Sequence, residues 1–230
     1  MPVERLYIFC EGQTKENFCN EVLSPHFRVL GVADVRPLLF PNKPKSNLRL
    51  HKGGWIRYDL ARRYMLRVMA EQHRPNTWFT TMVDLYAIPS DFPGLADAPV
   101  MPPRSRVQAL ERAMESDIRG TGYYRFTAHL QLHEYEALLL SDCAAIEAFF
   151  PAMVGLAEEL RRDIGSLEPE DVDEGPMSAP SKRIIRHAPE YKGLKTVAGP
   201  VIALHIGLPA LRQRCPHFGA WIDGLERSIS

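Results

Sequence analysis

The segment that decides the fold is TWFTTMVD, residues 77–84. This run of strand-favouring residues predicts a β-strand that ends at a carboxylate, Asp84, just before the proline-rich stretch 87–104. Working outward, the chain alternates between strand-like and helix-like segments. The strand candidates are residues 4–10, 34–40, 77–84 and 123–133, and the helical segments that follow them cover residues 14–24, 55–73, a stretch from Ser105 and a stretch from Glu134.

Strand followed by helix, four times over, predicts the α/β class: a Rossmann-like, mostly parallel sheet with helices on both faces. Thr14 is the expected N-cap of the first helix, and Pro25 is expected to end or bend it. Residues 123–133 alternate polar and apolar side chains, which predicts a half-buried strand. We expect residues 1–150 to form the core and residues 151–230 a helical extension packed on it, with a mobile acidic loop at 166–180.

The composition of the chain excludes several classes of protein but does not by itself identify a function. The 230 residues hold 28 Lys and Arg against 28 Asp and Glu, so net charge does not predict a polyanion partner. No apolar run reaches the ~20 residues that span a bilayer, and we read no signal peptide, so we expect a cytoplasmic protein without a membrane partner. Four scattered cysteines predict neither disulfides nor zinc. The absence of a GxxxxGK[ST] motif predicts no nucleotide cofactor in this chain.

Acidic side chains follow three of the predicted strands. These are Glu11, Asp84 and the pair Glu134 and Glu136. In open α/β sheets, sites form at the carboxyl ends of the strands, so the fold would gather these acids at one edge. Gathered carboxylates repel one another unless a cation neutralises them, and oxygen ligands favour Mg²⁺ or Mn²⁺. The alternative is local: Glu11 near a helix N-terminus, Asp84 in a turn, and Glu134 and Glu136 in the first turn of a helix.

Basic residues supply candidates for phosphate binding. The first group lies in the loop 41–54 and comprises Lys43, Lys45, Arg49 and Lys52. Lys182 and Arg183 follow Ser181 at a predicted helix start, where backbone N–H groups also favour an anion. His133 could polarise a water or a phosphate. The alternatives are a solvated loop, ordinary helix-start residues and a structural histidine.

The segments EGQT, VDLY and QLHEYEALL, in this order, resemble those of an uncharacterised bacterial family with a Toprim-like core, whose members are often found with AAA-type ATPases in defence loci. The resemblance implies that Glu11 is the Toprim glutamate and Asp84 the first aspartate of Asp-x-Asp, while Tyr86 stands where the second would be. It further implies a later acid, Glu134 or Glu136, and a basic residue near the scissile phosphate, Lys182. Thr14, Glu16, Tyr86 and His133 would be auxiliary residues around that site.

Three functions stay open from the sequence. The first is a Mg²⁺- or Mn²⁺-dependent nuclease in antiviral defence or DNA maintenance, with Glu11, Asp84, Glu134 and Lys182 as catalytic residues and nucleic acid, most simply DNA, as substrate. The second is a Toprim-derived binding module or regulator of a partner ATPase, with little chemistry of its own. The third is a small-molecule phosphotransferase or phosphatase. A homodimer is compatible with each.

Overall fold

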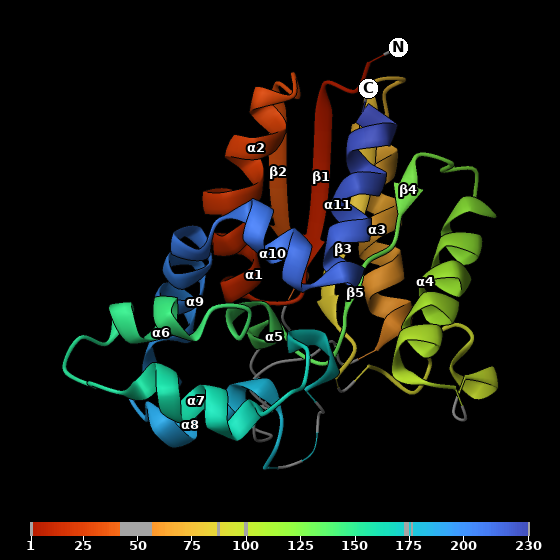
Figure 1. Ribbon diagram of the computed structural model, residues 1–230. Coiled ribbons are helices and arrows are strands. Elements are labelled where there is room, and N and C mark those ends of the chain that lie inside the picture. The colour runs from red at the N-terminus through yellow and green to blue at the C-terminus, as the bar shows by residue number, and fades with distance from the viewer. Residues whose placement is uncertain are drawn as a thin grey trace, which may run out of the picture.

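The computed structural model describes residues 2–41, 57–86, 88–98, 101–172, 175 and 177–229. Its sheet is parallel throughout and has the order β2-β1-β3-β4, with β5 pairing with β3 beyond the end of β4. The strands are β1 (Arg5–Cys10), β2 (Asp34–Leu39), β3 (Thr77–Asp84), β4 (Phe126–Thr127) and β5 (Leu130–Gln131). The predicted α/β class, a parallel sheet flanked by helices, is confirmed (Figure 1).

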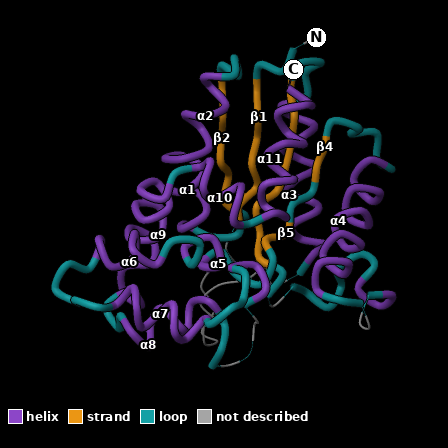
Figure 2. The backbone as a smooth tube through the Cα atoms, viewed as in Figure 1, coloured by secondary structure: helices purple, strands orange, loops and turns teal. Residues whose placement is uncertain are grey.

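Helices cover both faces of this sheet (Figure 2). They are α1 (Gln13–Phe18), α2 (Ser24–Val29), α3 (Tyr58–Gln72), α4 (Pro103–Arg119), α5 (Glu136–Leu139), α6 (Cys143–Phe149), α7 (Leu156–Ile164), α8 (Pro180–His187), α9 (Tyr191–Ile206), α10 (Leu208–Arg214) and α11 (Pro216–Ile229). Within the described residues no single helix has the length and hydropathy to cross a membrane, and one bent pair, α9 with α10, passes that test jointly.

The sheet separates the interior into two hydrophobic cores, one on each of its faces. Successive side chains of β1 point to opposite faces, so Leu6 and Ile8 join one buried cluster and Tyr7 and Phe9 join the other. The first cluster includes side chains of α1, α2 and the helices from α5 to α11, and the second is covered by α3 and α4. The C-terminal helices therefore complete the core on one face of the sheet.

The first helix departs from its predicted ends. Its N-cap is Gly12, whose carbonyl accepts the backbone N–H groups of Lys15 and Glu16, and Thr14 lies inside α1, so the predicted Thr14 cap is wrong. Pro25 does not end the helix. A π-helical turn, Cys19–Leu23, leads into α2, where Pro25 sits in the first turn. Proline is tolerated in a first turn because its missing N–H has no intrahelical partner there.

The segment 123–133 forms two short strands instead of one. The hydroxyl of Thr81 accepts the backbone N–H of His129 at 2.9 Å and donates to its carbonyl at 3.1 Å, so a side chain interrupts the ladder between β4 and β5. The polar face of residues 123–133 is not solvated either. His129 is fully buried and stacks on Trp221 of α11, with ring centroids 4.2 Å apart. The half-buried prediction is wrong because α11 covers that face.

A buried carboxylate fixes the start of α11. Glu170 is fully buried in the stretch 166–180, of which residues 173, 174 and 176 lie outside the described part. Its two oxygens accept the backbone N–H groups of His217 at 2.8 Å and Phe218 at 3.0 Å. Both donors lie in the first turn of a helix, where the helix dipole also stabilises an anion.

We therefore expect Glu170→Ala to lower the free energy of unfolding by about 2 kcal/mol, because two buried N–H groups lose a charged acceptor. Asp171→Ala is the matched control, since the ion pair of Asp171 with Arg104 is solvent-exposed and exposed pairs contribute at most about 1 kcal/mol. Urea denaturation of both variants measures the difference. Equal stability of the two variants would contradict this role of Glu170.

Candidate functional site

The two strand-end acids meet at the carboxyl edge of the sheet. Glu11 directly follows β1, and Asp84 is the last residue of β3, its parallel neighbour. The backbone N–H of Asp84 donates to Glu11 Oε2 at 3.2 Å. Parallel register thus brings together two carboxylates that are 73 residues apart in the chain.

A lysine lies between these two carboxylates. Lys15, in the first turns of α1, donates from Nζ to Glu11 Oε1 and to Asp84 Oδ2, each at 2.8 Å. Its side chain is only 6% exposed. Burial by itself would lower the pKa of Lys15, but the carboxylates of Asp84 and Glu11 outweigh it and raise that pKa above its ordinary value. Lys15 is therefore a fixed cation and not a general base.

Asp84 retains one unused oxygen. Its Oδ1 is buried and has no hydrogen-bond partner among the described residues. Burial raises the pKa of Asp84 well above its ordinary value; Lys15 opposes the shift, while Glu11 and Glu136 add to it. An unsatisfied buried oxygen is costly, so its presence at the edge of a sheet indicates a binding position. The oxygen donors of Glu11 and Asp84 suit a hard cation, and the Lys15 ammonium holds the space between them.

The later acids have partners of their own. Glu136, at the start of α5, is 2.7 Å from Lys195 Nζ through its Oε1, which also accepts a hydrogen bond from the Tyr191 hydroxyl at 3.3 Å. The negative charge of Glu136 also adds to the raised pKa of Asp84. The Glu134 carboxylate instead accepts the backbone N–H of Ser181 at 3.0 Å and caps α8. A metal-binding role for Glu134 stays a prediction.

The remaining predicted residues have partners of their own, are exposed, or lie outside the described part of the chain. Lys182 is exposed, and Arg183 is held by Asp163, 2.8 Å away. The Tyr86 side chain is 47% exposed, while its backbone N–H donates to the carbonyl of the buried His133. The other predicted residues are Thr14, packed near Gly199; Glu16, hydrogen-bonded to Gln13; and Lys43, Lys45, Arg49 and Lys52, which lie outside the described residues.

Residues 10–226 match the family model described as a domain of unknown function, DUF4276. The chain belongs to the DUF4276 family. This confirms the predicted membership of an uncharacterised family, while the Toprim core and the ATPase association stay predictions. Among solved structures, this DUF4276 chain is similar to the C-terminal region of the Burkholderia pseudomallei OLD protein, with a TM-score of 0.42 and 14% identity over 97% of this chain and 98% of the other. No curated protein matches it.

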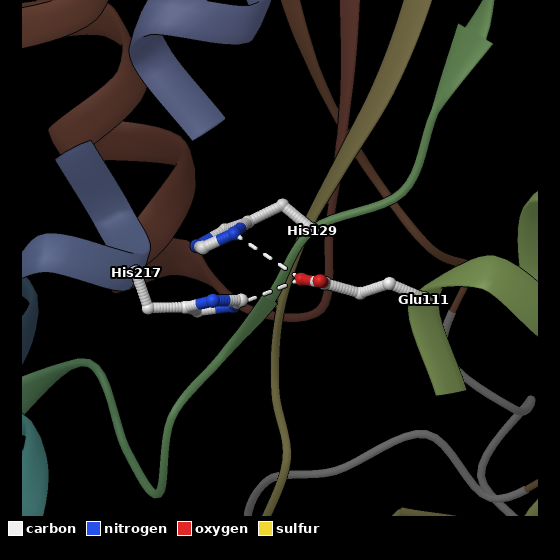
Figure 3. Close-up of side chains that lie close together, drawn as sticks. All are labelled: Glu111, His129 and His217. Carbon is white, nitrogen blue, oxygen red and sulfur yellow. Dashed lines mark hydrogen bonds and ion pairs between the residues drawn. The ribbon is translucent and has the colours of Figure 1, made fainter. Parts of the chain in front are cut away.

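A second cluster of residues that can bind metal lies inside this DUF4276 domain, and no sequence motif predicts it. Figure 3 shows His129 and His217 side by side, both directed at the carboxylate of Glu111 from α4. Glu111 Oε1 is 3.0 Å from His217 Nε2 and 3.5 Å from His129 Nδ1, and it accepts the backbone N–H of Leu130 at 2.8 Å. Within the described residues these three side chains form a group whose ligand atoms lie within 4.8 Å of one another.

Chemically, the cluster can share a proton or hold a divalent ion, since two imidazoles and a carboxylate are also zinc ligands. The two rings are stacked, with centroids 5.1 Å apart and planes 25° apart. His217 Nε2 also lies 3.1 Å from the carbonyl of Leu130, an acceptor for an N–H donor. The geometry favours a proton shared with Glu111.

No local signal could have found this cluster. Residues 111, 129 and 217 come from a helix, the break between two strands and the C-terminal helix. Their spacing matches no metal motif, and His217 in CPHF reads as a packing residue. Only the position of α11 over the sheet brings them together.

Proposed function

We propose that this DUF4276 domain is a Mg²⁺- or Mn²⁺-dependent hydrolase that cleaves phosphodiesters in nucleic acid. One observation carries the proposal: Glu11 and Asp84 meet at the carboxyl edge of a parallel sheet, with one buried oxygen of Asp84 unused. A divalent ion there would supply charge stabilisation to the attacking and leaving oxygens of a phosphate. Antiviral defence or DNA maintenance is the setting that we infer from the sequence resemblance.

The chain's own residues would divide the work. Glu11 and Asp84 would hold the ion. Glu136 of α5, which is already paired with Lys195, would orient the water ligands of that ion. Lys182, exposed at the start of α8, would bind the phosphate of the substrate. Lys15 would keep a positive charge near the reacting group, because its raised pKa keeps it protonated.

The test is the cleavage of plasmid and of single-stranded DNA and RNA with Mg²⁺ or Mn²⁺. Asp84→Asn keeps the shape of the side chain and an acceptor for Lys15 but removes the charge, so we expect at least a ~100-fold loss of activity, the size of effect expected when one charged stabiliser is lost. Glu11→Gln should behave alike. Glu158→Gln, on the exposed side of α7, is the matched control and should retain full activity. Cleavage by Asp84→Asn at the wild-type rate would refute the proposal.

A second candidate function is a binding module that regulates a partner ATPase and has little chemistry of its own. The observation in its favour is Lys15, whose ammonium already occupies the space between the two acids. Co-purification with an ATPase, together with absence of cleavage in every variant, would select this alternative.

A further inference from the structure

Three acids, Glu11, Asp84 and Glu136, each form an ion pair with a lysine of the chain itself. Lys15 reaches Glu11 and Asp84 from α1, and Lys195 reaches Glu136 from α9. The two lysines differ in one respect. Lys195 is 33% exposed and touches one carboxylate, whereas Lys15 is 6% exposed and bridges two. Lys15 therefore controls whether anything else can bind between Glu11 and Asp84.

The position of the Lys15 ammonium is that of a bound cation. One nitrogen lies 2.8 Å from an oxygen of each carboxylate, so a single cation already bridges the two acids. A tethered cation competes with any free one at a high effective concentration, because its binding loses little translational freedom. Removing it would leave two like charges facing each other at a buried edge, an arrangement that a divalent ion relieves.

We propose that Lys15 sets the metal affinity of this site, acting as a built-in occupant that a divalent ion must displace from between Glu11 and Asp84. The inference rests on the proposed function, since it concerns the same carboxylates. It adds that the wild-type chain binds Mg²⁺ or Mn²⁺ weakly and that the weakness comes from Lys15. The metal site is then partly blocked in the wild type, and removing the charge of one lysine frees it.

The experiment measures Mn²⁺ binding directly, through the electron paramagnetic resonance signal of free Mn²⁺ and through calorimetry, without any substrate. We expect the Lys15→Met variant to bind Mn²⁺ at least ~10-fold more tightly than the wild type, because methionine nearly keeps the length of the lysine side chain but removes its charge. Lys192→Met is the matched control: Lys192 is exposed on α9, so its loss changes the net charge equally and should leave affinity unchanged. The double variant Lys15→Met with Asp84→Asn should lose the gain.

Because Lys15→Met leaves two buried acids without their cation, it is also expected to be less stable in a chelator and to regain thermal stability with Mn²⁺. If Lys15→Met does not fold, Lys15→Gln replaces it in the binding experiment, because glutamine keeps hydrogen-bond donors for the carboxylates but carries no charge. Affinity no higher than that of the wild type in the folded variant would overturn the inference.

The two proposals fail separately. A Lys15 variant that binds Mn²⁺ tightly while no form of the protein cleaves nucleic acid would leave the role of Lys15 standing and remove the proposed function. Conversely, the proposed function would stand and the role of Lys15 would fall if Asp84→Asn abolished metal-dependent cleavage while the Lys15 variants bound Mn²⁺ no more tightly than the wild type.

Discussion

Glu111→Ala is expected to lower the free energy of unfolding by roughly 3–5 kcal/mol, the usual cost of breaking a buried ion pair from one side. Glu111 Oε1 accepts the backbone N–H of Leu130 and faces His217 Nε2 at 3.0 Å. Alanine would leave the N–H of Leu130 without its acceptor and would leave His217 Nε2 with only the carbonyl of Leu130. It would also loosen the contact between α4 and the edge of the sheet. Denaturation by guanidinium at pH 7 measures this loss.

The milder variant Glu111→Gln isolates the charge. Burial alone would raise the pKa of Glu111, but His129 and His217 outweigh it and lower the pKa to about 2. A folded-state pKa below the unfolded value of about 4.5 means that the carboxylate stabilises the protein above pH 4.5. That contribution, roughly 3 kcal/mol, is lost as the pH falls from about 4.5 to 2.

In the Glu111→Gln variant, the free energy of unfolding should therefore fall less steeply than in the wild type as the pH drops from about 4.5 to 2. The histidines act at higher pH and in opposite directions. Burial would lower the pKa of His217, but Glu111 raises it, so the stabilisation by His217 is lost as the pH rises above 6.5. Burial lowers the pKa of His129, so its contribution is lost as the pH falls below 6.5. Stability curves of Glu111→Gln and wild type that run parallel from pH 5 to pH 2 would contradict this assignment.

Gly219→Ala is expected to cost roughly 3 kcal/mol or more, although alanine is the better helix former by about 1 kcal/mol. A Cβ at Gly219 in α11 would lie 2.6 Å from the backbone oxygen of Arg212 in α10. Backbone cannot move aside as a flexible side chain can, so the two helices would have to separate and open the core beneath them. Thermal unfolding should show a melting temperature lower by roughly 6–12 °C.

The matched control lies in the same helix. A Cβ at Gly224 would meet nothing closer than 3.9 Å, the end of the Arg227 side chain. Gly224→Ala should therefore leave stability unchanged or raise it by up to about 1 kcal/mol. If both glycine variants melt together with the wild type, α10 and α11 do not pack as closely as the structure shows.

The sequence by itself determined the sheet and the meeting of the acid pair. Residues 77–84 and the strand–helix alternation around them predict parallel strands, and parallel strands end at a common edge, so Glu11 and Asp84 have to come close. These are consequences of periodicity and chain direction, which are local properties. The single strand predicted over 123–133 failed because a distant group decides the backbone conformation there, as Thr81 does at His129. The Thr14 cap failed locally, since the helix begins two residues earlier, after Gly12.

Only the tertiary structure decided what surrounds the acid pair and what lies beneath α11. In the sequence Lys15 is an ordinary helical lysine, Gly219 a weak helix residue and Glu111 a surface acid. Their importance comes from the angles at which α1, α10 and α11 pack on the sheet, which place an ammonium between two carboxylates, one backbone against another and a carboxylate against two imidazoles. Such angles depend on the shapes of many buried side chains together, and the spacing of residues along the chain does not encode them.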